Sequence, residues 1–268
     1  MAHAHEPEER AADEWASKVA AWDARPLIQQ LTSAAAEALK SRGLLQPSTA
    51  VLELGCGTGL LAEKIVDSLG SYVGVDTSPA MVAAFQSKLA RRADSKLRCA
   101  LGQLTSTGLQ PVSQAEGAAG AEAEAAAETA AGSTAASAGA DAAAATGLQP
   151  GQFDLVLSHM TFHHLKDADE TLRTLLQYLR PGGAVAVFDL LKEPGSDRFH
   201  SRQHSHSVFH PGGFTPEEMQ QHMQGAGLVD AQAAAVAPFQ REAPEEPHDL
   251  LSLHLLLATA RRSQAGAG

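Results

Sequence analysis

Val51-Leu52-Glu53-Leu54-Gly55-Cys56-Gly57-Thr58-Gly59-Leu60 is the stretch of sequence that organises the rest of this chain. Its apolar first residues predict a buried strand, the glycines at alternate positions predict a tight turn, and apolar residues recur at helical spacing from Leu60 to Leu69. Glycines let a ligand approach the backbone closely, and the free N–H groups of a helix start can bind an anionic group such as a carboxylate. The stretch therefore predicts a ligand site where a strand meets a helix.

A second strand and a capped helix follow directly. Tyr72-Val73-Gly74-Val75-Asp76 predicts a strand that ends in an acid, and Ser78-Pro79 predicts a helix start, because serine is a good N-cap and proline suits the first helical turn. A dinucleotide-binding turn needs a third glycine inside its helix, where this chain has Leu60. An NAD-dependent oxidoreductase is therefore disfavoured.

These motifs, in this order, resemble class I S-adenosylmethionine-dependent methyltransferases of the small-molecule, ubiquinone/menaquinone-methyltransferase-like type. Further along the chain, Phe153-Asp154, His163-His164-Leu165 and Leu179-Arg180-Pro181-Gly182-Gly183 are similar to the matching family segments. The resemblance covers residues 45–105 and 150–260. It implies a Rossmann-like three-layer α/β sandwich with a seven-stranded, mostly parallel sheet whose last strand is antiparallel. It also implies S-adenosylmethionine as the cofactor.

The pattern and the resemblance together give the expected elements. The expected strands are 51–54, 72–76, 97–101, 153–158, 184–190, 228–239 and 251–260, and the expected helices are 8–21, 26–42, 60–69, 78–89, 167–179 and one that starts at 215. A short loop is expected between residue 102 and the strand at 153 once the insert described below is set aside. The helices before the first strand often cover the cofactor cleft in similar methyltransferases.

The resemblance implies a cofactor site at the glycine turn and the ends of the neighbouring strands. Asp76 is expected to bind both ribose hydroxyls, because an ionised carboxylate is a bidentate acceptor. Glu53 either orients the ammonium group, directly or through water, or is a buried structural acid. Where the family usually has an acid for the adenine amino group, this chain has Gln103, whose carbonyl oxygen can accept the same bond. The expected cofactor set is Glu53, Gly55, Cys56, Gly57, Gly59, Asp76, Thr77, Met81, Gln103, Leu104 and Ser158.

Some of these residues have a second interpretation. Met81 and Leu104 either pack on the adenine faces or are plain core residues. Cys56 stands in the turn because a small side chain is required there, and this interpretation outweighs a redox role. Ser158 and His159, at the tip of the fourth strand, are expected near the transferable methyl group.

The acceptor side is less defined by the sequence, because methyl transfer asks the protein mainly for positioning. His159, His163 and His164 are weak catalytic candidates. His163 and His164 are candidates for a general base, with loop anchoring as the alternative. A second set, His200, His204, His206 and His210, lies in a polar loop that faces either substrate or solvent. No acid or cysteine pattern frames this set, so we expect no metal site.

The acceptor is expected to be a small molecule, such as a phenol, a quinone-type ring or a carboxylate. One alternative is a protein side-chain methyltransferase. Another is a cofactor-binding regulatory protein without turnover, which the departure at Gln103 keeps open. The sequence predicts neither the acceptor atom nor the oligomeric state.

The domain organisation follows from length and composition. The 268 residues, 44% of them hydrophobic, suffice for one large domain at 45–268 with a helical extension at 1–44. An insert at 111–148 contains 18 alanines in 38 residues and no large apolar residue between Val112 and Leu148, so it is expected to be disordered. Its flanks repeat Thr-Gly-Leu-Gln-Pro, at 107–111 and at 146–150.

Charge and residue usage exclude several functional classes. A formal charge of −11 argues against a nucleic-acid surface. No apolar run is long enough to span a membrane, and the polar N-terminus carries no targeting signal, so we expect a cytoplasmic protein. Two cysteines, Cys56 and Cys99, provide no disulfide framework.

Overall fold

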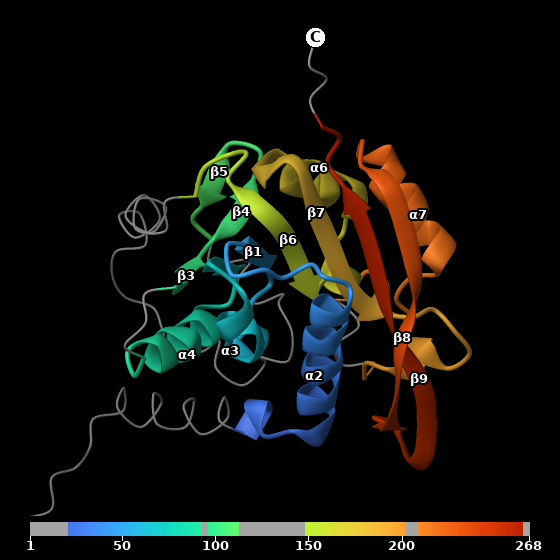
Figure 1. Cartoon of the computed structure of the whole chain (residues 1–268). Coiled ribbons are helices and arrows are strands. Elements are labelled where there is room, and N and C mark those ends of the chain that lie inside the picture. Colours follow the sequence, from blue (N-terminus) through green and yellow to red (C-terminus); the bar gives the residue numbers. More distant parts are fainter. Residues whose placement is uncertain (1–20, 93–95, 113–147, 202–207, 265–268) are drawn as a thin grey trace, which may run out of the picture.

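One mixed sheet forms the centre of the molecule. The computed structural model describes residues 21–92, 96–112, 148–201 and 208–264. The sheet has seven strands in the order β3-β2-β1-β6-β7-β9-β8 (Figure 1). These strands are β1 (Ala50–Leu54), β2 (Ser71–Asp76), β3 (Leu97–Leu101), β6 (Phe153–His159), β7 (Leu179–Leu190), β8 (Val229–Ala243) and β9 (Glu246–Arg261).

The pairing of these strands confirms the predicted fold class. Strands β3, β2, β1, β6 and β7 pair in parallel with their neighbours. The last strand, β9, is antiparallel to both β7 and β8. Because the carboxyl ends of the parallel strands meet at one edge, the loops that follow β1, β2, β6 and β7 lie near one another.

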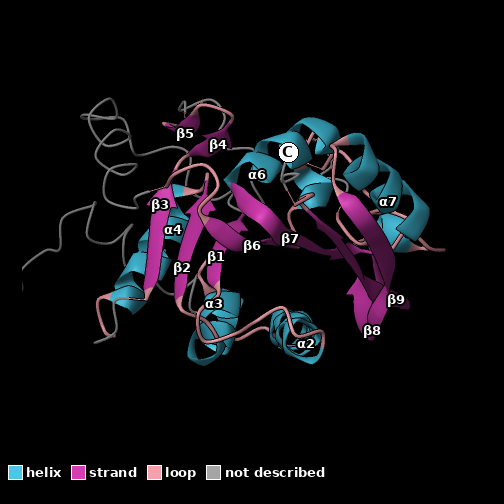
Figure 2. Ribbon diagram, turned by 45° about the horizontal axis from the view of Figure 1, so that its top comes forward, coloured by secondary structure: helices cyan, strands magenta, loops and turns pink. Residues whose placement is uncertain are grey.

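Helices cover both faces of the sheet and make a three-layer sandwich. The helices among the described residues are α2 (Pro26–Ser41), α3 (Leu60–Ile65), α4 (Pro79–Leu89), α6 (Ala168–Tyr178) and α7 (Pro216–Gly225), with short 3₁₀ turns at η1 (Val66–Ser68), η2 (Phe162–His164) and η3 (Ser196–Arg198). Figure 2 shows α2 and α3 on one face and α6 and α7 on the other. One apolar core includes Leu39, Ile65 and Phe85, and the other includes Leu172 and Met219. In the part of the chain that the structure describes, no helix is both long and apolar enough to cross a membrane.

The predicted helix starts are confirmed by their caps. The hydroxyl of Ser78 accepts a hydrogen bond from the Met81 N–H at 3.4 Å. Thr215 and Glu218 form a reciprocal capping box, in which each side chain accepts from the other residue's backbone N–H. Some bounds differ: α3 ends at Ile65 and passes into η1, and β7 begins at Leu179 instead of residue 184.

A small hairpin replaces the loop that was predicted after β3. Strands β4 (Gln103–Thr105) and β5 (Gly108–Gln110) pair antiparallel, and Leu104 lies opposite Leu109. Both leucines are buried in the apolar core that includes Leu172 of α6 and Met219 of α7. Each strand is only three residues long, which is too short for a periodic signal. The first copy of the repeat is thus part of the folded domain.

The structure describes both ends of the predicted insert at 111–148. Leu148, its predicted last residue, packs partly buried against the same core. Residues 113–147 lie outside the described residues, as does the predicted helix at 8–21 of the N-terminal extension, apart from its last residue.

Candidate functional site

The glycine turn between β1 and α3 has one position that opens onto free space. All three glycines have positive φ angles, +72° at Gly55, +52° at Gly57 and +76° at Gly59. A Cβ at Gly55 would stand 2.2 Å from the Thr161 hydroxyl, and one at Gly59 would stand 2.3 Å from the Phe85 ring. A Cβ at Gly57 would meet no atom within 4 Å. Packing therefore requires two of these glycines, and Gly57 alone faces the space that a ligand can use.

Asp76 ties the end of β2 to this turn. One carboxylate oxygen accepts from the Gly57 N–H and the other from the Ser78 N–H, both at 2.8 Å. Burial raises the pKa of Asp76, while hydrogen bonds from the backbone N–H groups of Ser78, Gly57 and Thr77 act to lower it. A carboxylate oxygen can accept more than one hydrogen bond. Asp76 is therefore placed to accept from a ligand beside Gly57.

Glu53 is a buried acid directly before the turn. Its side chain is only 2% exposed, and the hydroxyl of Tyr72 donates a hydrogen bond to its carboxylate. Burial is the main reason that the pKa of Glu53 is raised to about 8. A carboxyl group with this pKa holds its proton near neutral pH, unless a cation comes close enough to favour the ionised form. Both predicted roles of Glu53, ammonium ligand and structural acid, fit this geometry.

Some of the other residues in the expected cofactor set are buried in contacts within the protein, and others have exposed side chains. The Cys56 side chain is buried and packs over Gly74, where an added Cβ would meet the Cys56 sulfur at 2.7 Å. The Ser158 side chain is fully buried and donates to the Leu54 carbonyl at 3.0 Å. Leu104 packs in the core, which was its alternative interpretation. Partly or fully exposed side chains remain at Thr77, Met81 and Gln103.

A contact that the sequence did not predict holds the N-terminal segment on the glycine turn. The buried hydroxyl of Thr58 donates to the Asp23 carboxylate at 2.5 Å. Lys88 of α4 forms an ion pair with the same carboxylate at 2.6 Å. The pair Asp23–Thr58 spans 35 positions with no motif to link them. The segment that leads into α2 therefore lies against the turn.

A cluster of imidazoles occupies the carboxyl ends of β6 and β7. His163 is 1% exposed, and its Nδ1 lies 2.7 Å from the carboxylate of the fully buried Asp189. Although burial alone would raise the pKa of Asp189, its interactions with His163 lower it below the ordinary value. The rings of His164 and His200 lie beside His163, with centroids at 4.2 and 4.9 Å.

The structure describes two of the four loop histidines. The ring of His200 lies beside His163 and His164, and His210 packs its ring against Phe214 at 4.6 Å. His204 and His206 lie outside the described residues. No sequence spacing links His200 to His163, because they belong to different loops.

His159, which was predicted to lie near the methyl group, is the last residue of β6, and its side chain is partly buried. Its ring packs edge-on against Phe188, with centroids 6.3 Å apart. Burial is the main reason that the pKa of His159 is lowered to about 4. This imidazole is therefore neutral at physiological pH and a weak base. Its role near the acceptor stays a prediction.

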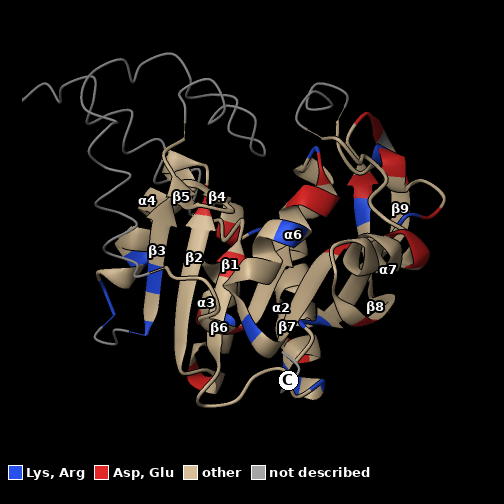
Figure 3. Ribbon diagram, turned by 90° about the horizontal axis from the view of Figure 1, so that it is seen from above, with Lys and Arg blue, Asp and Glu red and all other residues tan. Residues whose placement is uncertain are grey.

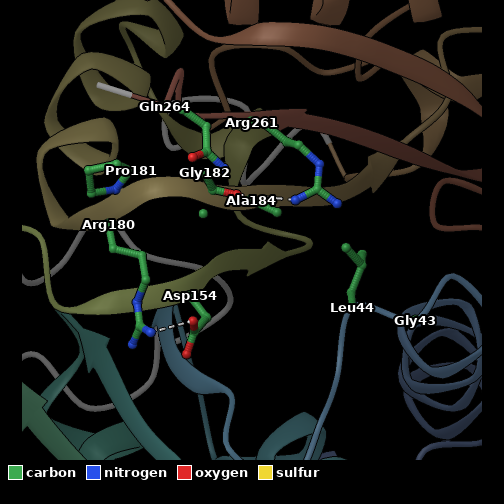
Figure 4. A pocket seen from close by; sticks show the side chains of 10 residues that line it. Gly43, Leu44, Asp154, Arg180, Pro181, Gly182, Ala184, Arg261 and Gln264 are labelled. Carbon is green, nitrogen blue, oxygen red and sulfur yellow. Dashed lines mark hydrogen bonds and ion pairs between the residues drawn. The ribbon is translucent and has the colours of Figure 1, made fainter. Parts of the chain in front are cut away.

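A pocket at the opposite end of the sheet does not belong to this site. Figure 4 shows it at the amino ends of β6 and β7, where Arg180 forms an ion pair with Asp154 at 2.8 Å. Arg261 donates to the Gly182 carbonyl in the same place, at 3.1 Å. The glycine turn, Asp76 and the histidine cluster are all at the carboxyl ends of their strands, so the pocket is separate from them.

Sequence comparison relates most of the chain to a known domain. Residues 20–233 match the profile of a methyltransferase domain. An uncharacterized methyltransferase of Schizosaccharomyces pombe is 28% identical over 197 residues, which cover 70% of this chain and 56% of that protein. The chain thus spans little more than half the length of this curated relative.

Solved structures resemble the fold as a whole. A chain from the complex that contains the Haloferax volcanii Trm112 methyltransferase activator has a TM-score of 0.61 at 18% identity, over 96% of this chain and 97% of that chain. Haemonchus contortus phosphoethanolamine N-methyltransferase 2, solved with S-adenosyl-L-methionine, has a TM-score of 0.55 at 15% identity. The match covers 85% of this chain and 52% of that chain. At these identities the likeness concerns the fold.

Proposed function

The chain belongs to the methyltransferase domain family, and from that premise we propose that it transfers a methyl group from S-adenosylmethionine to a small-molecule acceptor. The observation that carries the proposal is the hydrogen bond at 2.8 Å between the Gly57 N–H and Asp76, at the one turn glycine that faces open space. It joins the carboxyl ends of β1 and β2, which is where this class of sheet binds its ligands.

The residues at this end of the sheet fit S-adenosylmethionine. The backbone at Gly57 leaves room for the methionine part, and the Asp76 carboxylate offers acceptors to the ribose hydroxyls. Glu53 is a buried acid that an ammonium group would compensate. The cofactor supplies a methyl group on a positively charged sulfur, which is a good leaving group. The work left to the protein is to orient the two reactants and to exclude water.

Two covering segments favour a small acceptor. The N-terminal segment holds the glycine turn through Asp23 and Thr58, and the loop after β7 is held to His163, whose carbonyl accepts from the N–H groups of Phe209 and His210 at 3.0 and 2.9 Å. Figure 3 shows Lys and Arg scattered over several elements with acids among them, unlike the basic stripe of a nucleic-acid surface.

The test uses the full chain with S-adenosylmethionine that carries a deuterated methyl group. The protein is incubated with a cell extract that has been divided by size into metabolites and proteins, and both fractions are analysed by mass spectrometry. We expect a deuteromethylated compound in the metabolite fraction only. Label in the protein fraction alone would favour side-chain methylation, and cofactor binding without transfer to either fraction would favour a regulatory protein. The variant Gly57→Val should remove the labelled product.

A further inference from the structure

Three histidines from two loops meet at the carboxyl ends of β6 and β7. His163 and His164 belong to η2, directly after β6, and His200 follows η3 in the loop after β7. Their ring centroids lie 4.2, 4.9 and 5.2 Å apart. Each residue offers one ring nitrogen, and these three nitrogens all lie within 4.8 Å of one another. Such a convergence of imidazole nitrogens is the first requirement of a metal site.

The hydrogen bonding within the cluster is incomplete. Among the described residues, the buried Nε2 atoms of His163 and His200 have no hydrogen-bond partner. Buried polar atoms are normally paired, because leaving one unpaired forfeits its interaction with water. Two unpaired nitrogens beside a third imidazole therefore point to a ligand that accepts electron pairs.

Asp189 completes the arrangement from behind His163. Its Oδ1 lies 2.7 Å from Nδ1 of His163, and its Oδ2 accepts from the His163 backbone N–H at 3.2 Å. Metal-binding histidines almost always donate their second N–H to such a partner, which fixes the tautomer and leaves the other nitrogen to bind the ion. Asp189 also contributes a negative charge, whereas the positive charge of Arg241, whose guanidinium lies over the Phe199 ring at 4.4 Å, acts on His200.

We propose that His163, His164 and His200 bind a divalent transition-metal ion, with zinc as the best fit, and that Asp189 orients His163 toward it. Zinc binds imidazole nitrogen at about 2.0–2.1 Å in tetrahedral geometry, which places two ligands roughly 3.4 Å apart. Metal binding therefore requires the ring nitrogens to come closer together than their present separation of up to 4.8 Å. Magnesium and calcium prefer oxygen ligands and are not suited to this set.

Three protein ligands leave one tetrahedral position open, as in catalytic zinc sites. Because the cluster lies at the ends of β6 and β7, this position faces the acceptor side of the cleft. An acceptor oxygen bound there would lose its proton more readily; this role, unlike metal binding itself, rests on the proposed function. The metal takes the Nε2 that a general base would use, so the two roles of His163 exclude each other.

The site is tested by metal binding, without a methyl-transfer assay. The untagged full chain is stripped with a chelator and titrated with Co²⁺, followed by Zn²⁺ in competition with a fluorescent zinc chelator. We expect one tight equivalent and the visible spectrum of tetrahedral Co²⁺. His200→Ala should weaken binding at least about tenfold. His200→Cys should restore it and add a sulfur-to-cobalt charge-transfer band, because a thiolate is also a zinc ligand.

The matched control is His248→Asn, which removes an exposed histidine near the start of β9, where φ is +84° and asparagine is tolerated. It should bind zinc as the wild type does. The proposal is overturned if the wild type takes up no tight equivalent, or if His200→Ala binds as tightly as the control in a protein whose thermal unfolding is unchanged. His163→Ala is avoided, because it would also remove the imidazole that faces the buried Asp189 carboxylate. A zinc-binding protein that transfers no methyl group would contradict the proposed function and leave the metal site intact.

Discussion

The cofactor half of the molecule (β1, β2 and the turns that follow them) and the acceptor half (β6, β7 and the loops that follow them) are specified by the sequence in different ways. In the cofactor half, Gly57 and Asp76 are 19 positions apart and belong to one continuous β-α-β unit. In the acceptor half, His163 meets Asp189 at a separation of 26 positions and His200 across two loops. A site contained in one supersecondary unit can be recognised from sequence, whereas a site made by separate loops needs the fold.

The largest expected effect is a loss of cofactor binding with the acceptor half left unchanged. We expect Gly57→Val to weaken S-adenosylmethionine binding by about 100-fold or more, because its side chain would fill the open space above the turn. Isothermal titration measures this loss. Zinc binding at the histidine cluster should be unchanged in the same variant, which makes it a test of whether the two halves are independent.

Gly151→Val provides the matched control for backbone strain. Gly151 also has a positive φ, +70°, and a Cβ there would likewise meet nothing within 4 Å. A valine costs about the same strain at either position. If Gly151→Val lost cofactor affinity as Gly57→Val does, strain alone would explain the effect, and the assignment of Gly57 to the cofactor would be wrong.

Asp76→Ala comes next in size. Hydrogen bonds to a charged group contribute about 1.5–3 kcal/mol, so we expect a loss of roughly 10- to 100-fold in S-adenosylmethionine affinity. Asp76→Asn, which keeps one carbonyl oxygen, should lose less. Thermal unfolding of both variants shows how much of the change comes from the lost bonds to Gly57 and Ser78. An unchanged dissociation constant in a folded Asp76→Ala would refute the ribose assignment.

The same contrast explains what the sequence predicted well and what it could not. The strands, the glycine turn and the capped helix at Ser78 follow from local patterns, and the structure confirms them. The reason for each glycine was not local: the Phe85 ring requires Gly59, and the Thr161 side chain requires Gly55. A contact between residues of different loops, such as that of Thr58 with Asp23, produces no periodic pattern in the sequence.

The β4–β5 hairpin and the histidine cluster were missed for the same physical reason. Leu104 is buried because it lies opposite Leu109, and the three residues of each strand contain no pattern that predicts this pairing. The sequence assigned His200 to a polar loop and gave no sign that the chain path brings its ring beside His163. Tertiary contacts, which sequence spacing does not encode, decide both features.

A smaller effect concerns Glu53 and depends on pH. Because the pKa of Glu53 is about 8, an ammonium group that binds beside it should displace its proton. We expect S-adenosylmethionine binding at pH 7 to release a proton, measured as a binding enthalpy that changes with the ionisation enthalpy of the buffer. Glu53→Gln should abolish this release and weaken binding by up to about tenfold. Proton release that persists in Glu53→Gln would show that another group binds the ammonium.

The stability of the unliganded protein supplies an independent check on Glu53. Its pKa rises from an ordinary value of 4.5 to about 8 on folding. The stability that its proton provides is therefore fully present below about pH 4.5 and is lost as the pH rises through about 8. Glu53→Gln should flatten this dependence. Tyr72→Phe should instead shift it to higher pH, because the Tyr72 hydroxyl lowers the pKa of Glu53.

The smallest expected effect comes from the insert, which belongs to neither half. Joining Ser106 to Thr146 removes 107–145, and the second repeat then supplies Gly147-Leu148-Gln149 in place of Gly108-Leu109-Gln110. The hairpin sequence is reproduced residue for residue, with Leu148 at the buried position of Leu109. The connection to β6 shortens from 42 residues, 111–152, to three, 150–152.

Loop-closure entropy changes by only about 0.6 kcal/mol for each doubling of length, so we expect the free energy of unfolding to stay the same or rise by roughly 1–2 kcal/mol. Denaturant unfolding measures it, and both S-adenosylmethionine and zinc affinities should match the wild type. A second variant that removes 113–147 keeps every described residue and leaves a link of seven, 111–112 with 148–152. If both variants aggregate or lose either ligand, the insert packs on the domain and takes part in one of its halves. If only the variant that lacks 107–145 fails, both copies of the repeat are needed. The three-residue link would then be too short to let Leu148 take the place of Leu109 while the chain continues into β6.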